Sequence, residues 1–209
     1  MTSLLNLNNR YAGLTYTAKQ IGHHFIKSKY YIEPFSGMAR TAKYANSEIM
    51  VLNDISEFAN KKCKKLFPKA IITNMDFIEC IKKYNFEDSF FLIDPPWRLD
   101  HYDTNSETSL ERWKNADKKT RGDLSLIETS RLNRDTAVEY IEALEKILPT
   151  IKGTYIVTLG GMWLKKKIKS PYSKLVIHTH SRIFGYKPKT LMFSNKPLEI
   201  QIPQIIDYV

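Results

Sequence analysis

The sequence predicts a single α/β domain built on a mostly parallel sheet. Short apolar runs alternate with longer segments of mixed polarity, a pattern typical of strands separated by helices. A length of 209 residues suits one domain with a sizeable core, and 43% hydrophobic with 26% charged residues is ordinary for a globular protein. No repeat or low-complexity linker divides the chain, so we expect residues 1–209 to form one domain.

Seven segments are expected to be strands, because each is a short apolar run of strand length. They are Tyr30–Phe35, Ile49–Asn53, Ala70–Thr73, Phe90–Ile93, Thr154–Leu159, Lys174–Thr179 and Thr190–Ser194. The residues between the last two include Gly185 and Pro188, which suit a hairpin turn or a longer loop.

Helices are expected between the strands, at Ser56–Leu66 and most clearly at Asp135–Leu148. Apolar residues in the second segment recur at the spacing of one helical face. They are Ala137, Val138, Ile141, Leu144, Ile147 and Leu148. Asn133 is a plausible N-cap, and Pro149 should end this helix.

The segment Arg98–Leu132 is polar and weakly periodic. Long irregular segments inside a domain are usually functional or disordered. We interpret this one as an insertion that contacts substrate or acts as a lid, with surface disorder as the alternative.

The charge balance favours an anionic partner. The chain has 32 Lys and Arg against 22 Asp and Glu, a net charge of +10, so nucleic acid is the first candidate; an evenly solvated surface is the alternative.

The start of the chain lacks a secretory pattern, and no apolar run approaches membrane-span length. With only Cys63 and Cys80, we expect reduced thiols and a cytoplasmic protein without membrane contact. The histidines lack metal-ligand spacing, so no metal site is expected.

A fourth-strand motif, Asp94-Pro95-Pro96-Trp97, carries the clearest chemical signal. The exocyclic amine of a base is a poor nucleophile, because its lone pair is delocalised into the ring. A carboxylate and a rigid backbone carbonyl that accept its two hydrogens would localise that pair, and Trp97 offers a face for a flipped-out base. The alternative is a rigid turn followed by a core tryptophan.

Acidic residues also follow the first three predicted strands. Glu33 precedes a turn, Pro34–Gly37, whose glycine lets a ligand approach the backbone. Asp54 ends the second strand, where an acid can accept hydrogen bonds from ribose hydroxyls. Asp76 and Phe77 follow the third strand and could accept from an adenine amine and pack on its ring. Tyr11-Ala12-Gly13 precedes an expected helix, with a simple turn as the alternative.

In combination, these motifs resemble the Dam-like (D12 class) adenine-N6 DNA methyltransferases. The resemblance covers roughly residues 10–197, because "YIVTLGG" looks like the family's fifth strand and "LVIHTHSRIFGYKPKTLMFSNKP" like its closing hairpin. It implies a Rossmann-like fold of seven strands with an antiparallel last strand, and S-adenosylmethionine (SAM) as cofactor.

The resemblance also implies roles for individual residues. Glu33, Pro34, Phe35 and Gly37 would line the amino-acid end of the cofactor, together with Tyr11 and Gly13. Asp54 would hold the ribose, and Asp76 with Phe77 the adenine. Asp94, Pro95, Pro96 and Trp97 would grip the target adenine.

The chain departs from the family in two ways. Thr15 stands where a lysine is usual, and no target-recognition domain fits in the 57 positions between Gly37 and Asp94 (94 minus 37). Specificity would then come from Arg98–Leu132 and Arg182–Lys189, or from a partner protein. Basic residues expected along a nucleic-acid path are Lys165, Lys166, Lys167, Arg182, Lys187 and Lys189.

Two alternatives to an adenine-specific DNA enzyme stay open. An RNA adenine methyltransferase can carry the same Asp-Pro-Pro-Trp, although in the messenger-RNA type the catalytic motif comes before the cofactor motif. A catalytically silent module could keep the fold and only bind nucleic acid for a partner. Cytosine-N4 enzymes usually have serine in place of Asp94, which argues against cytosine.

Overall fold

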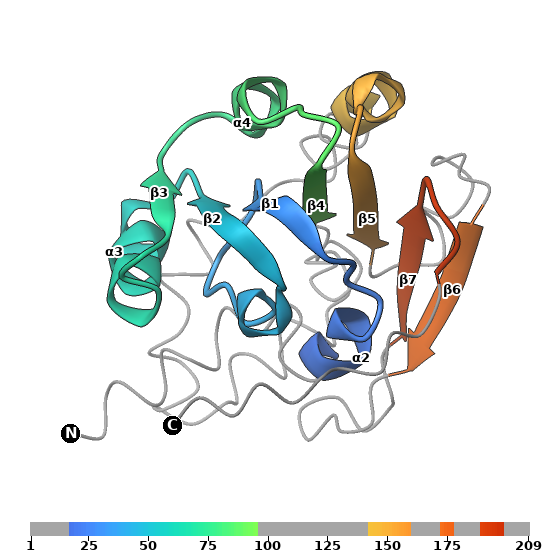
Figure 1. The fold of residues 1–209 in the computed structure, drawn as a ribbon, viewed down its shortest axis with the longest axis horizontal. Coiled ribbons are helices and arrows are strands. Elements are labelled where there is room, and N and C mark those ends of the chain that lie inside the picture. Colours follow the sequence, from blue (N-terminus) through green and yellow to red (C-terminus); the bar gives the residue numbers. More distant parts are fainter. Residues whose placement is uncertain (1–16, 96–141, 160–171, 178–188, 199–209) are drawn as a thin grey trace, which may run out of the picture.

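The architecture is a seven-stranded sheet in the order β3-β2-β1-β4-β5-β7-β6 (Figure 1). A computed structural model describes residues 17–95, 142–159, 172–177 and 189–198. β1 to β5 are parallel, whereas β7 is antiparallel to both β5 and β6. The strands are β1 Ser28–Glu33, β2 Ser47–Asn53, β3 Ile71–Thr73, β4 Ser89–Ile93, β5 Thr154–Leu159, β6 Tyr172–Ile177 and β7 Lys189–Ser194. The predicted Rossmann-like fold with an antiparallel last strand is confirmed.

β1 and β6 differ from the predicted segments at both ends, whereas the other strands differ by at most two residues at their starts. β1 ends at Glu33 and does not continue to Phe35, because Pro34 has no N–H with which to extend the ladder. β6 begins at Tyr172 and ends at Ile177, two residues before the predicted segment at each end.

The described helices are short; the first precedes β1, and the others lie between strands. They are α2 Ala18–Gly22, η1 Ala42–Tyr44, α3 Glu57–Leu66, α4 Phe77–Lys83 and η2 Leu148–Thr150. α3 confirms its prediction, and the Ser56 side chain caps it by accepting from the N–H of Ala59. Residues 142–147 are α-helical, and the helix gives way at Leu148 to η2, which contains Pro149, so its end lies within one residue of the predicted one; Asn133 lies outside the described residues.

The sheet separates two apolar cores, because successive strand residues point to opposite faces. On one face, Ile32 and Phe91 pack with α4 and with the helix that carries Leu144. On the other, Tyr31 and Phe90 pack with α2, η1 and α3. Figure 1 shows these helices on the two sides of the sheet.

Both cysteines are free thiols, as predicted, and both are buried. Burial raises the pKa of Cys63 to about 11 and that of Cys80 to about 12, which leaves both thiols protonated at neutral pH and unreactive. Within the described ranges, every helix is too short or too polar to cross a bilayer. The predicted insertion Arg98–Leu132 lies outside the described residues.

Candidate functional site

Acidic residues meet at the carboxyl ends of three parallel strands. Glu33 is the last residue of β1, Asp54 follows β2 and Asp94 follows β4. Since β1 pairs with both β2 and β4, their carboxyl ends lie at one edge of the sheet. This edge is where open α/β sheets bind ligands.

The turn after β1 has the backbone shape that the sequence predicts. Gly37 has a φ of 50° and Ala39 a φ of 47°, both in the left-handed region that glycine tolerates best. The N–H of Ser36 donates to the carbonyl of Asn53 at 2.7 Å, and that of Ala39 to the carbonyl of Ser36 at 2.6 Å. The turn is therefore fastened to the end of β2, and Pro34 is buried beneath it.

Asp54 holds this turn in place. Its Oδ2 accepts the N–H of Gly37 at 2.8 Å, and its Oδ1 accepts the N–H of Ser56, also at 2.8 Å. Burial raises the pKa of Asp54, and these two N–H donors oppose the increase. A carboxylate has about four acceptor sites, so ribose binding by Asp54 stays a prediction that is compatible with this geometry.

Glu33 is a buried carboxylate with two hydroxyl donors on one oxygen. Its Oε1 accepts from the Tyr31 hydroxyl at 2.5 Å and from the Thr41 hydroxyl at 2.7 Å. Burial raises the pKa of Glu33 to about 7, the two hydroxyls oppose the increase, and the charges of Asp94 and Asp54 add to it. The sequence analysis missed Tyr31 and Thr41, because each reads as an ordinary strand or turn residue.

Asp94 is half-buried and oriented by the neighbouring strand. The hydroxyl of Thr158, on β5, donates to Oδ1 of Asp94 at 2.6 Å. The charge of Asp94 contributes to the raised pKa of Glu33, and the two residues lie at the carboxyl ends of directly paired strands. Pro95 is buried behind Asp94.

The two residues predicted to contact the cofactor adenine differ in burial: Asp76 is exposed and Phe77 is buried. Asp76 is exposed and caps α4, with its Oδ1 accepting the N–H of Ile78 at 2.8 Å. The Phe77 ring is only 6% exposed, and its centroid lies 4.8 Å from that of Phe35. Phe77 therefore contributes mainly to the core, and adenine packing by its ring stays a prediction.

Asn53 is a structural residue of the site that the sequence analysis missed. Its side-chain amide donates to the carbonyls of Pro34 and Met75 at 3.0 and 2.9 Å. Its carbonyl oxygen accepts from the Thr73 hydroxyl at 2.8 Å and the Met75 N–H at 3.0 Å. One buried side chain thus joins the ends of β1, β2 and β3, and a polar residue at the end of an apolar strand was the available signal.

Several predicted site residues lie outside the described residues. They are Tyr11, Gly13, Pro96, Trp97, Lys165, Lys166, Lys167, Arg182 and Lys187. Lys189 begins β7 and pairs in register with Ile177 of β6. Among the described residues, no three His, Cys, Asp or Glu side chains are grouped to hold a metal ion.

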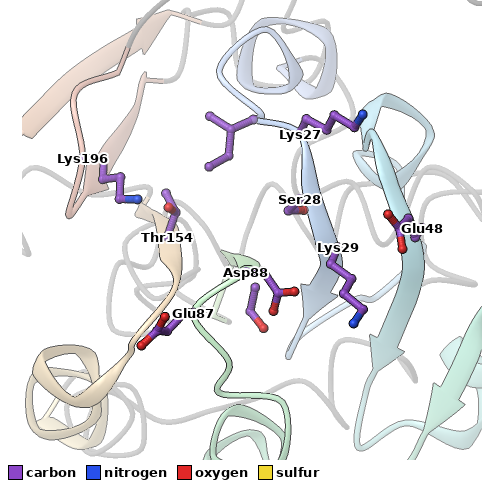
Figure 2. Close-up of a pocket in the computed structure, with 10 residues that line it drawn as sticks. Lys27, Ser28, Lys29, Glu48, Glu87, Asp88, Thr154 and Lys196 are labelled. Atoms are coloured by element: carbon purple, nitrogen blue, oxygen red, sulfur yellow. The ribbon is translucent and has the colours of Figure 1, made fainter.

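A separate pocket of about 390 Å³ opens at the opposite, amino-terminal edge of the sheet. Figure 2 shows acidic and basic side chains around it, including Lys29 of β1, Glu48 of β2 and Asp88 just before β4. It contains none of the predicted cofactor or catalytic residues. Its lining is Ile26, Lys27, Ser28, Lys29, Glu48, Glu87, Asp88, Ser89, Thr154 and Lys196.

Comparison with known proteins gives structural neighbours only. No family model and no curated protein matches the sequence. Similar solved structures include an rRNA methylase from Streptococcus thermophilus (TM-score 0.48, 9% identity, covering 88% of this chain and 96% of that one). Others are the 23S rRNA methyltransferase ErmE (0.46, 10%, 89% and 69%) and spermidine synthase from Thermotoga maritima (0.47, 10%, 85% and 56%). Similarity at this level does not select a reaction.

Proposed function

We propose that this protein is a SAM-dependent methyltransferase that acts on the N6 amine of adenine in DNA. One observation carries the proposal: Glu33 ends β1 and Asp94 follows β4, two strands that pair directly, and the charge of Asp94 contributes to the raised pKa of Glu33. A residue suited to the cofactor and a residue suited to the acceptor amine therefore stand on neighbouring strands at one edge of the sheet. Direct transfer between two bound molecules needs that proximity.

The edge fits the cofactor electrostatically. SAM has positive charge on its sulfonium and ammonium groups, and Glu33, Asp54 and Asp94 bring carboxylates to this edge. The left-handed Gly37 keeps the turn free of a side chain, so that a ligand can approach its backbone. Bound there, SAM would supply an electrophilic methyl carbon.

Asp94 and Pro95 would prepare the acceptor. The Asp94 carboxylate accepts one hydrogen of the adenine amine, and the carbonyl of Pro95 accepts the other. So held, the amine nitrogen would face the methyl carbon that bound SAM supplies, and transfer would release the demethylated cofactor. The resulting ammonium loses its proton to solvent, so Asp94 need not be a strong base, and positioning supplies most of the catalysis.

DNA is favoured over RNA by the order of the motifs. The turn at Pro34–Gly37 precedes Asp94 along the chain, as in the Dam-like enzymes that the sequence resembles. A silent binding module is disfavoured because Asp54, Asp76 and Asp94 are all present. A partner protein that supplies target specificity stays a prediction.

The Asp94→Ala variant tests the catalytic assignment. We expect transfer to fall by about 10²- to 10³-fold or more, the effect of removing one hydrogen-bonding group from a preorganised site, while SAM binding measured by calorimetry stays within a few-fold. Labelled SAM, DNA or RNA and nucleoside mass spectrometry identify the product. Asp88→Ala is the matched control, because Asp88 lies at the other end of β4 and is exposed.

Three results would contradict the proposal. Full activity in Asp94→Ala would remove Asp94 from the mechanism. Methylation of RNA alone would favour the RNA alternative, and wild-type protein that gives no binding heat with SAM would favour the silent module.

A further inference from the structure

Thr158 is the polar residue that faces the candidate acceptor site from β5. The last paired residues of β4 and β5 are Ile93 and Val157, so Asp94 and Thr158 occupy the next positions on adjacent strands. Figure 1 shows β4 and β5 side by side. The Thr158 hydroxyl donates to Oδ1 of Asp94 at 2.6 Å, although the residues are 64 positions apart in the chain.

Thr158 is buried, and its hydroxyl donates a hydrogen bond to the Asp94 carboxylate. Thr158 is 0% exposed, and two residues on its own side of the sheet, Ile156 on β5 and the cross-strand partner of Thr158 on β7, Met192, are buried and apolar. A buried hydroxyl is costly without a hydrogen bond, and a carboxylate acceptor makes the bond shorter and stronger than a neutral one. The bond also restricts the terminal torsion of Asp94, which is otherwise broad.

We propose that Thr158 is a positioning residue for the acceptor amine and acts by holding the Asp94 carboxylate in one orientation. The inference rests on the proposed function and extends it to a residue outside Asp94–Trp97. By keeping Oδ1 directed at β5, Thr158 determines how the carboxylate meets the amine. Rotation of the carboxylate would misplace the amine relative to the methyl carbon, and a misplacement near 1 Å can reduce the rate about 10²-fold.

Thr158→Val and Thr158→Ser separate orientation from packing. Valine keeps the volume and loses the donor, whereas serine keeps the donor. We expect kcat to fall about 10- to 100-fold in Thr158→Val, with the Kd and KM for SAM within about twofold, and Thr158→Ser to restore most of the rate. Thr154→Val is the matched control, because Thr154 is also buried on β5 but at the amino end of the strand; its kcat should not change.

The outcomes separate this inference from the proposed function. Wild-type protein that transfers no methyl group overturns the proposed function, and the role of Thr158 with it. Active wild type with unchanged kcat in Thr158→Val, or with equal losses in the serine and valine variants, overturns only the positioning role. Thr158→Ala gives a second variant without the donor if the valine variant melts at a lower temperature, and an unchanged kcat there would also reject the role.

Discussion

Glu33 is a fully buried carboxyl group, and its burial disfavours the ionised form. Burial raises its pKa to about 7, although Tyr31 and Thr41 both donate to its carboxylate. A carboxyl with a raised pKa stabilises the fold below its unfolded pKa, near 4.5, and that contribution is lost as the pH rises through about 7. Under the proposed function, this loss of stability follows from placing a negative charge where a cationic group of the cofactor would bind.

Glu33→Gln should therefore stabilise the protein at high pH. The variant keeps a carbonyl acceptor for both hydroxyls and removes the charge, and one pKa unit corresponds to about 1.4 kcal/mol. We expect the free energy of unfolding at pH 8 to rise by roughly 2 to 3 kcal/mol, with no difference below pH 4.5. Urea unfolding at both pH values measures this, and exposed Glu48→Gln is the control.

The same variant should bind the cofactor less tightly. Wild-type affinity for SAM should increase as the pH rises through about 7, because the ionised carboxylate attracts the cofactor ammonium. Glu33→Gln should lose that dependence. An unchanged pH profile of the calorimetric Kd would show that Glu33 does not contact a charged group of the ligand.

At the scale of elements, the amino ends of β4 and β5 approach unusually closely. A Cβ on Gly153 would lie 2.2 Å from the carbonyl oxygen of Ser89 and 2.9 Å from that of Phe86. Nearby, the Asn195 amide donates to the carbonyl of Gly153 at 2.8 Å, which ties β7 to the same point. Glycine is thus required by the approach of two backbones.

Gly153→Ala should separate these strands. Both contacts are backbone atoms that cannot rotate away, so we expect a loss of about 1 to 3 kcal/mol or more in the free energy of unfolding, the range for overpacked sites. Denaturant titration measures it, with Lys152→Ala as the exposed neighbouring control. A loss below about 0.5 kcal/mol, the level of ordinary surface changes, would show that the close approach relaxes easily.

At the scale of the whole molecule, the net charge is +10, but some of the lysines already have contacts within the chain. Lysines of α3 already have local contacts: Lys61 lies 3.9 Å from Glu57, Lys62 lies 5.5 Å from the centre of the Phe58 ring, and Lys64 donates to the carbonyl of Pro68. This agrees with a solvated helix face. Nucleic-acid binding by the basic residues of the predicted path stays a prediction.

DNA affinity should depend steeply on salt. If the six predicted residues of the nucleic-acid path each neutralise a phosphate, raising salt from about 50 to 200 mM should weaken binding by roughly 10³-fold. Replacing Lys165, Lys166 and Lys167 with alanine should lower the slope of log K against log salt by about 3. Replacing Lys61, Lys62 and Lys64 with alanine should leave it unchanged, and equal effects of the two sets would reject the prediction.

Local sequence pattern determined most of the architecture. Strands such as Thr154–Leu159 and the helix Glu57–Leu66 lie where apolar runs and capping residues placed them, because periodicity and capping act over a few residues. The acids Glu33, Asp54 and Asp94 were found for the same reason, since each follows an apolar run. The end of β1 differs from the predicted one because Pro34 has no N–H to donate to the ladder.

Only the tertiary structure decided how those acids are held. The hydrogen bond between Thr158 and Asp94 spans 64 positions, and Asn53 bonds Thr73 and Met75, 20 and 22 positions away. The raised pKa of Glu33 depends on burial and on charges from other strands. Such contacts follow from which strands become neighbours in the sheet, and the order β2-β1-β4-β5 brings together residues whose proximity no local pattern encodes.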